Sequence, residues 1–360
     1  MQKTALHDWH AENGGRIVDF AGWAMPVQYS TITEEHTAVR TAAGLFDIAH
    51  MGRLKFTGPD ACRFLDNVVT NDVTRLKVGD IRYALVTNQA GGILDDVLVY
   101  RFDDCYMLVV NASNREKIVA WLQQHRSGFD VQFDDLTLSH YMLAIQGPKS
   151  IEVLSGLTDL DLDGMKYYSG THATVNGVAG IVSRTGYTGE DGFEIVVPVE
   201  SAVELWHSLM SAGAPLGLKA AGLGCRDTLR LEAAMPLYGH EMDESTDPFT
   251  AGLNFGVKLK TGDFIGRDAL VKIRQRDDLQ IRVGLELEGR RIAREDVEVY
   301  WGKQRVGHVT SGTFSPTLEK SISMAYVDSN CSAVGTQLNV NIRGKEYPAR
   351  VVPLPFYKRS

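Results

Sequence analysis

The sequence predicts an α+β protein of two or three domains that ends in a β-barrel or β-sandwich. The chain has 360 residues, which is more than one ordinary hydrophobic core encloses. Residues 51–138 mix strand-like and helix-like patterns within a short stretch, as a compact α+β module does. From residue 279 onward, short alternating runs are separated by glycine-rich turns, a pattern typical of barrels and sandwiches.

The first long helix is expected over residues 34–45, where Gly44 ends it. The next run, FDIAHMGRLKFTG, is strand-like, because Leu54 and Phe56 alternate with polar neighbours. A Gly-Pro-Asp turn then opens a second helix, ACRFLDNVV.

Three strands and a helix follow in the same module. The runs IRYALVTN, GGILDDVLVYRF and YMLVVNA are apolar enough for strands. Asn111 or Ser113 is expected to cap the helix NREKIVAWLQQH, since short polar side chains accept hydrogen bonds from the first free N–H groups.

A new unit begins at HYMLAIQGPKS, where an apolar strand precedes Pro148 in the first turn of a helix. This stretch lacks the Gly-Lys pair and the spacing of a phosphate-binding loop. The strand EIVVPV and the helix SAVELWHSLMSAG come next, followed by a helix that carries Arg226. The alternating runs IRVGLELEG, VEVYWGKQRVGHVTSG and LNVNIRG then form the predicted all-β region.

Composition and charge exclude several functional classes. The content is 44% hydrophobic and 23% charged, with a net charge of −8. No basic stripe is present to neutralise phosphates, so a nucleic acid is not the expected partner. No window approaches the roughly 18 consecutive apolar residues of a membrane span, and the N-terminus has no apolar signal region. We therefore expect a cytoplasmic protein without membrane association, with a processed organellar form left open.

Catalytic signatures of the common kinds are missing. The four cysteines are scattered without a CxxC motif, which suits neither zinc nor a disulfide framework. The sequence has no GxSxG, HExxH or strand-linked GxGxxG motif. The ten histidines occur singly, and His50, at an expected strand start, is the one most worth testing as a site residue. We expect no metal.

The stretch RTGYTGEDGFE, residues 184–194, is the strongest candidate for a binding site. Its glycines allow tight turns and close approach to a ligand. Glu194 stands at the start of a strand, where Phe193 and Ile195 face the opposite side, and Tyr187 lies a few residues upstream. The carboxylate is either a surface strand acid or an acceptor for a paired N–H/NH2 edge, with the tyrosine as a flat wall.

Asp95 and Asp96 interrupt the apolar strand ILDDVLVY. Consecutive strand residues face opposite sides, so one carboxylate points each way. A buried carboxylate is costly unless it is paired or protonated. The pair is therefore either a turn or cap feature after Gly91-Gly92, or a carboxylate placed beside a reacting nitrogen.

Arg226 leaves two interpretations open. It forms an ordinary helix ion pair near Asp227 or Glu232, or it holds a carboxylate or orients Glu194. The planar guanidinium suits both of the latter tasks.

Seven ordered blocks carry a resemblance to a known family: FAGWAMPVQY, GLFDIAHMG, TNDVTRLKVGD, GGILDDVLVYR, RTGYTGEDGFE, RDTLRLEAAMPLYGHE and VTSGTFSPTLEKS. Together they resemble the aminomethyltransferase of the glycine cleavage system (T-protein), from about residue 4 to the C-terminal PLPFYKR. The resemblance implies three domains in a ring around a central tetrahydrofolate pocket. The implied bounds are 1–50 plus 139–275 for a folate-binding α+β domain, 51–138 for a ferredoxin-like α+β domain, and 279–360 for the C-terminal β-barrel.

The resemblance also implies an activity. A one-carbon unit passes from the aminomethyl-lipoyl arm of the carrier H-protein to tetrahydrofolate, which yields methylene-tetrahydrofolate, ammonia and the dihydrolipoyl carrier. Tetrahydrofolate is the acceptor substrate, and the H-protein and the other glycine cleavage components are the implied partners. By matching motif, Asp96 is the expected catalytic residue beside the folate nitrogens. The other implied folate contacts are Met51, Tyr83, Asn111, Tyr187, Glu194, Arg226 and Tyr357.

Two rival functions use the same fold. A folate-dependent demethylase of a small methylated amine or sulfonium compound shares the pocket but not the carrier. A non-enzymatic folate-binding protein of iron–sulfur assembly has a K-G-C-Y/F-x-G-Q-E signature where this chain has RTGYTGEDGFE. The missing cysteine motif counts against the second rival, while a change of donor stays open for the first.

Overall fold

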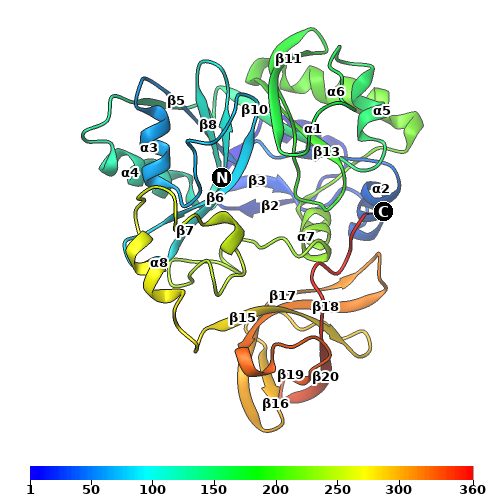
Figure 1. Cartoon of the computed structure of the whole chain (residues 1–360). Coiled ribbons are helices and arrows are strands. Elements are labelled where there is room, and N and C mark those ends of the chain that lie inside the picture. The colour runs from blue at the N-terminus through cyan, green and yellow to red at the C-terminus, as the bar shows by residue number, and fades with distance from the viewer. Residues whose placement is uncertain (360) are drawn as a thin grey trace. The chain divides into compact units, whose positions relative to one another are not determined.

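The computed structural model of the chain describes residues 1–359 and divides into two compact units (Figure 1). The first unit comprises residues 1–66, 72–84 and 97–227. The second comprises residues 67–71 and 85–96 together with the chain from Thr228 onward. The mixture of helices and strands, with a closed barrel near the C-terminus, confirms the predicted α+β class.

A six-stranded sheet forms one layer of the first unit, and apolar side chains pack two helices against it. Figure 1 shows α5 (Ser150–Ser155) and α6 (Ala202–Gly213) beside this sheet. Trp206 and Leu209 of α6 share a buried core with Phe193 and Ile195, so alternate residues of the central strand enter the core. The strand order is β11 (Ser169–Val175), β12 (Val178–Arg184), β13 (Gly192–Pro198), β10 (His140–Gln146), β4 (Gly44–Asp47) and β14 (Lys219–Ala220).

A five-stranded sheet is the second layer, and the boundary between the two units falls within β6 and β7. Phe56 and Phe64 make an aromatic contact, with ring centroids 6.2 Å apart, so α3 packs on β5. The strand order is β6 (Ile81–Thr87), β7 (Ile93–Arg101), β8 (Tyr106–Val110), β5 (Gly52–Thr57) and β9 (Gln132–Asp135). The helices that follow its strands are α3 (Ala61–Val68), the 3₁₀ turn η1 (Ala112–Asn114) and α4 (Arg115–His125).

The N-terminal segment adds a small sheet and two helices to the first unit. Thr31 accepts a hydrogen bond from the Glu34 amide and so caps the second helix. The elements are β1 (Gln2–Lys3), β3 (Trp23–Pro26) and β2 (Ile17–Phe20) in sheet order, with α1 (His7–Glu12) and α2 (Ile32–Thr41).

The second unit contains a closed six-stranded barrel. Its interior is apolar, with Val283, Leu285, Val309 and Val340 among the buried residues, as the alternation in the sequence predicts. The strands in barrel order are β15 (Gln280–Leu287), β18 (Lys320–Asp328), β17 (Gln304–Ser315), β16 (Glu298–Trp301), β19 (Gln337–Ile342) and β20 (Lys345–Val352).

The remaining elements are short, except for one helix that crosses the boundary between the units. They are η2 (Val199–Ser201), η3 (Ala214–Leu216), α7 (Leu223–Glu232), η4 (Asn254–Gly256), α8 (Arg267–Ile273) and η5 (Ser329–Cys331). The unit boundary falls within α7, after Asp227.

The helix expected over residues 34–45 is wrong at both ends. It starts at Ile32 and stops at Thr41, and Gly44 instead begins β4. A Cβ on Gly44 would lie 2.4 Å from the Val39 side chain. Glycine is therefore present for close packing between helix and strand, rather than as a helix terminator.

Three further predictions about local structure are corrected. The run FDIAHMGRLKFTG is two strands, β4 and β5, separated by a turn over residues 48–51. Pro148 precedes α5, which begins at Ser150, and so lies outside its first turn. Neither Asn111 nor Ser113 is the N-cap of α4; Asn114 holds that position, and no side chain makes a capping bond there.

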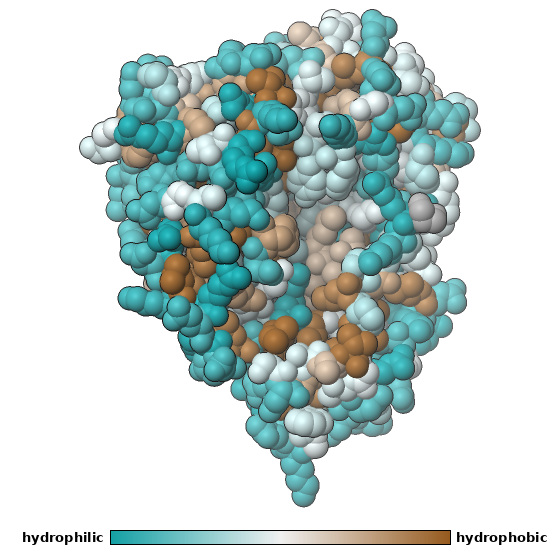
Figure 2. All heavy atoms as spheres, viewed as in Figure 1, coloured by the Kyte–Doolittle hydropathy of each residue, from teal (hydrophilic) through white to brown (hydrophobic). Residues whose placement is uncertain are grey.

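Polar side chains cover much of the face in Figure 2, with apolar patches scattered among them. Within residues 1–359, no helix is long and apolar enough to cross a membrane. The same residues contain no group of three or more His, Cys, Asp or Glu side chains arranged to hold a metal ion. All four cysteines, Cys62, Cys105, Cys225 and Cys331, are free thiols.

Candidate functional site

The loop between β12 and β13, which carries RTGYTGEDGFE, is fixed by two ion pairs. Arg184 binds Asp191 through both Nε and Nη2, at 3.0 and 2.5 Å. Arg40 of α2 binds Glu190 at 2.9 Å and donates to the Thr188 carbonyl at 2.7 Å. Glu190 and Asp191 therefore hold the shape of the loop.

The side chain of Gln146, at the end of β10, explains why residues 186 and 192 are glycines. Its side chain is buried and held at both ends, because Nε2 donates to the Thr185 carbonyl and Oε1 accepts from the Thr188 hydroxyl, each at 2.9 Å. A Cβ on Gly186 would lie 1.9 Å from Gln146, and one on Gly192 would lie 2.4 Å from it. The loop packs onto a fixed amide, so these positions need glycine.

Glu194 is buried within the sheet with only 6% of its surface exposed. It faces away from the core that Phe193 and Ile195 enter, as the alternation predicted. Thr185 donates from Oγ1 to Glu194 Oε2 at 2.6 Å. Burial raises the pKa of Glu194, and the Thr185 bond and the positive charge of Arg226 only partly oppose this shift. Because Glu194 is buried, the surface-acid interpretation is wrong.

Arg226, on the first turn of α7, stacks on Tyr187. Its guanidinium carbon lies 4.8 Å from the centre of the tyrosine ring, a cation–π geometry. Burial lowers the pKa of Arg226, and the charge of Glu194 opposes that shift. Nη1 is shielded from solvent and has no hydrogen-bond partner among the described residues. The structure thus brings Glu194, Tyr187 and Arg226 together, and it leaves a donor available beside a carboxylate.

The turn over residues 48–51, which carries His50 and Met51, is held on one side by a buried carboxylate. Asp47 accepts hydrogen bonds from the Ala49 amide and from His10 Nε2, each at 2.9 Å, and from the Tyr141 hydroxyl at 2.5 Å. These bonds, with His10 the largest contributor, keep the pKa of Asp47 below its ordinary value although burial raises it.

A buried guanidinium holds the same turn from the other side. Arg53 donates to the carbonyls of Met51 at 2.5 Å, Ala49 at 3.1 Å, Thr137 at 2.6 Å and His140 at 2.9 Å. The turn therefore has both its N–H and C=O groups tied to charged side chains, which fixes the position of Met51.

His50 is 2% exposed, and its ring packs edge-on against Phe20 with centroids 5.4 Å apart. Its Nδ1 has no hydrogen-bond partner among residues 1–359. Burial lowers the pKa of His50 to about 4; the charge of Asp47 opposes this shift, and the charges of Arg226 and Arg53 add to it. His50 is therefore a neutral imidazole in the same region of the first unit as Arg226.

The other predicted site residues are partly exposed. In the first unit, Tyr83 lies on β6 and Asn111 follows β8. In the second, Asp96 lies on β7, and Tyr357 follows β20 and donates its amide to the Glu232 carbonyl at 2.8 Å.

The aspartate pair lies within a strand. Asp95 is completely buried and Asp96 is partly exposed, so the two carboxylates differ in environment as the alternation predicted. Both lie inside β7, which begins at Ile93, so the turn-or-cap alternative is wrong.

Sequence reasoning missed three contributors to this site. Thr185 binds Glu194 directly, Tyr100 is fully buried beside the same carboxylate, and Asp47 anchors the Met51 turn. The only signal for Thr185 was that it belongs to the same glycine-rich stretch. Asp47 lies three residues before His50 in a run expected to be a continuous strand, and no local pattern marked it as a site residue.

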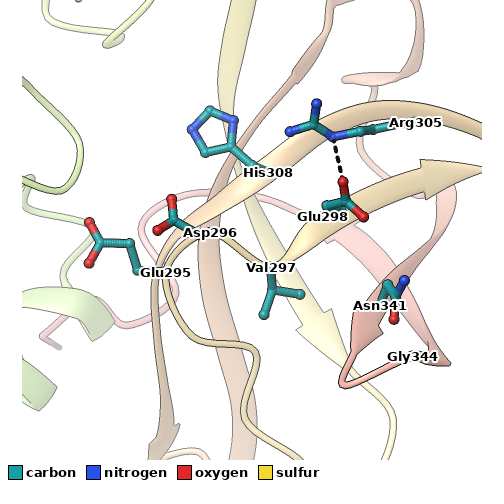
Figure 3. A pocket seen from close by; sticks show the side chains of 8 residues that line it. All are labelled: Glu295, Asp296, Val297, Glu298, Arg305, His308, Asn341 and Gly344. Atoms are coloured by element: carbon teal, nitrogen blue, oxygen red, sulfur yellow. Dashed lines mark ion pairs between the residues drawn. The ribbon is translucent and has the colours of Figure 1, made fainter.

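A cavity of about 680 Å³ lies on the barrel of the second unit (Figure 3). Its lining includes the three acids Glu295, Asp296 and Glu298, and two of them are already paired. Arg305 binds Glu298 at 3.2 Å, and His240 binds Glu295 at 3.2 Å. None of the predicted site residues lines it.

Comparison with known proteins assigns the family. Residues 6–261 match the family model described as the GCVT N-terminal domain, and residues 281–358 match the glycine cleavage T-protein C-terminal barrel domain. The chain belongs to the glycine cleavage T-protein family. It is 48% identical to an aminomethyltransferase of Streptomyces coelicolor, covering 100% of this chain and 98% of the relative. It is 46% identical to one of Caldanaerobacter subterraneus, covering 100% and 97%.

A solved structure supports the same assignment. The crystal structure of glycine cleavage system aminomethyltransferase T from Bartonella henselae superposes with a TM-score of 0.93 at 34% identity. The match covers 99% of this chain and 98% of that one. The resemblance deduced from the ordered sequence blocks is therefore confirmed.

Proposed function

We propose that this chain is a tetrahydrofolate-dependent aminomethyltransferase. It takes the methylene group from the aminomethyl-lipoyl arm of an H-protein carrier and forms 5,10-methylenetetrahydrofolate. The observation that carries the proposal is the full-length match to aminomethyltransferases. The second support is chemical: the first unit contains a buried carboxylate, a stacked arginine and an aromatic ring in one place.

Glu194 is suited to the pterin end of the substrate. A reduced pterin presents an N–H and an amino group side by side, and a carboxylate accepts from both. Thr185 holds one oxygen of Glu194 in position, which orients the group before the ligand arrives. The positive charge of Arg226 favours the ionised form of Glu194 and partly offsets the effect of burial, and Tyr187 offers a flat apolar wall.

The reaction needs proton transfer and charge stabilisation rather than a nucleophilic side chain. The methylene carbon forms bonds to N5 and N10 of tetrahydrofolate and breaks its bonds to the lipoyl sulfur and the amine nitrogen. The two protons from N5 and N10 leave with the thiol and with ammonia. Positive charge develops at the carbon as the amine departs, and we assign Asp96 to stabilise it or to steer the attacking amine. Removing such a group costs about 10²–10⁴ in rate.

The remaining assignments complete the proposal. Met51, Tyr83, Asn111 and Tyr357 line the folate site, and the reaction requires no metal. The partners are the lipoyl-bearing H-protein and the other glycine cleavage components. The place of action is the cytoplasm, or the mitochondrial matrix for a processed form. The three domains have the bounds 1–50 plus 139–275, 51–138 and 279–360.

The test is a reconstituted reaction. The protein is mixed with tetrahydrofolate and an aminomethyl-loaded lipoyl carrier, and both ammonia and methylene-tetrahydrofolate are measured. We expect ammonia release that depends on tetrahydrofolate; its absence would sink the proposal. Dimethylglycine and sarcosine serve as alternative donors, and turnover of these without the carrier would instead identify a demethylase.

Asp96→Asn tests the catalytic assignment. We expect turnover to fall about 10²–10⁴-fold while tetrahydrofolate still binds. Asp103→Asn, at an exposed position after β7, is the matched control and should turn over normally. Normal turnover in Asp96→Asn would remove this residue from the mechanism.

A further inference from the structure

Strands of the five-stranded and six-stranded sheets together line a cavity of about 490 Å³. This volume is in the range of small-molecule sites. The cavity walls come from β5 and β8 on one side and from β10, β11, β12 and β13 on the other. Most of the wall is apolar, formed by Phe102, Met107, Leu136, Ile181, Val196 and Pro198.

Cationic and titratable nitrogens reach this apolar cavity from several directions. Arg53 and Lys55 share the face of β5 opposite the core residues Leu54 and Phe56. His140 and His172 line it as well, and no residue of its lining is an acid. An apolar enclosure with this charge pattern is complementary to an anion.

Arg53 contributes a buried positive charge to this region. Its side chain is completely buried, and its Nη atoms are occupied by backbone carbonyls, while Nε has no partner among the described residues. Asp135 and Asp47 act on this charge, but Asp135 already binds Arg115 at 2.7 Å, Asp47 binds His10, and neither lines the cavity. The guanidinium therefore lacks a carboxylate of its own, which is costly in an apolar setting.

The cavity is separate from the candidate folate site. Ser183 pairs with Glu194 across β12 and β13, whereas Ile181 pairs with Val196 two residue pairs further along. Two residues of a strand span about 7 Å. The buried rings of Tyr100 and Phe102 stack with centroids 6.2 Å apart, and burial and the nearby charge of Glu194 raise the pKa of Tyr100. Phe102 in turn contacts His172, with ring centroids 4.7 Å apart, and both of these residues line the cavity, whereas Tyr100 does not.

We propose that this inter-sheet cavity is a second binding site, which takes a small molecule with a flat apolar body and a single anionic group. The apolar body lies among Phe102, Met107 and Val196, and the anion is directed to Lys55, with the buried charge of Arg53 behind the wall. The site does not depend on the folate assignment, because it shares no residue with it.

The experiment uses the full chain and the fluorescent anion 8-anilino-1-naphthalenesulfonate, with the uncharged N-phenyl-1-naphthylamine as the second probe. Titrations are repeated with saturating 5-formyltetrahydrofolate, which occupies the folate site. We expect saturable binding of the anion that persists under this competitor, and weaker binding of the uncharged probe. Complete displacement by 5-formyltetrahydrofolate would overturn the proposal.

Paired variants locate the bound probe. Lys55→Glu should weaken anion binding about tenfold, the effect of losing one charged contact. Lys77→Glu makes the same charge change at an exposed site away from the cavity and should leave binding unchanged. If both variants weaken anion binding equally, the loss of affinity comes from the net charge of the protein, which would contradict a defined site.

A second pair of variants tests the site by side-chain size, without any change of charge. Ala179 is exposed at the cavity rim, so Ala179→Trp fills the space without disturbing a core, and Ala179→Ser is its control. We expect the tryptophan variant alone to lose the probe. Full binding by that variant would place the probe elsewhere and refute the assignment.

Discussion

Thr185 donates a 2.6 Å hydrogen bond to the buried carboxylate of Glu194, nine residues later in the chain. The two meet because the intervening loop folds back on itself and packs on Gln146. The bond lowers the pKa of Glu194 against the larger effect of burial, which raises it. A hydroxyl in the loop therefore helps to keep an acceptor charged inside the sheet.

Replacing Thr185 by valine tests this relationship. Thr185→Val keeps the shape but removes the donor, so the pKa of Glu194 should rise further and the ionised form should become scarcer. Tetrahydrofolate should bind about tenfold more weakly, and the acid limb of its pH–affinity profile should move to higher pH. The measurement is a binding titration between pH 5 and 8, with Thr185→Ser as a control that keeps the hydroxyl. An unmoved acid limb would show that Thr185 does not act through Glu194.

Glu194→Gln should separate stability from binding. The folded-state pKa of Glu194 is raised, so the folded protein holds a proton at a pH where the unfolded chain has released it. The charge therefore destabilises the fold increasingly as pH rises from the ordinary glutamate value through the raised one. The free energy of unfolding of the variant should be about 1 kcal/mol higher than that of the wild type at neutral pH. The variant should also bind tetrahydrofolate poorly.

The advantage of Glu194→Gln should shrink toward acid pH, where the wild-type carboxyl is also neutral. Denaturant unfolding at pH 4.5 and pH 7.5 measures this difference. A constant gap between the two proteins at both values would contradict the raised pKa.

Arg226→Lys addresses the stacked arginine. A lysine keeps the charge but loses the planar group that lies 4.8 Å from the Tyr187 ring. We expect KM for tetrahydrofolate to rise about tenfold, from the lost stacking and the altered donor geometry, with a smaller change in kcat. Tyr187→Phe keeps an aromatic face and should behave much more like the wild type. If Arg226→Lys has the wild-type KM, Arg226 neither meets the ligand nor orients Glu194.

Much of the fold follows from local patterns. Period-two alternation predicted the barrel strands and the outward-facing position of Glu194, opposite Phe193 and Ile195. The same rule predicted that Asp95 and Asp96 have different environments. These are properties of a strand with one buried face, which neighbouring residues determine.

The contacts that fix the site depend on distant partners. Gly44 looked like a helix terminator, but the helix ends earlier and the glycine makes room for Val39. Arg40 and Glu190 form a buried ion pair across 150 residues of chain, which no local pattern encodes. The turn between β4 and β5 was equally hidden, because its groups are satisfied by Asp47 and Arg53 rather than by a recognisable turn sequence.

His50 is expected to make the first unit sensitive to acid. The folded-state pKa of about 4 lies below the ordinary histidine value of 6.5, because burial disfavours the charged ring. Between these two pH values the unfolded chain binds a proton at His50 and the folded protein does not, so stability falls as pH drops from about 6.5 to about 4. The loss over this window is roughly 3 kcal/mol. His50→Asn should remove this slope while leaving stability at pH 8 within about 1 kcal/mol of the wild type, since Nδ1 has no partner to lose.

Urea unfolding from pH 8 to pH 4.5 measures the slope, and His207→Asn, at an exposed position of the same unit, is the control that should keep it. The pH slopes of the two variants are compared with each other. Neither slope is expected to be zero, because other groups titrate in the same range. If His50→Asn loses stability in parallel with His207→Asn, His50 takes up its proton without unfolding. Its ring would then be solvated on protonation, and the neutral imidazole beside Arg226 would not be a fixed feature of the site.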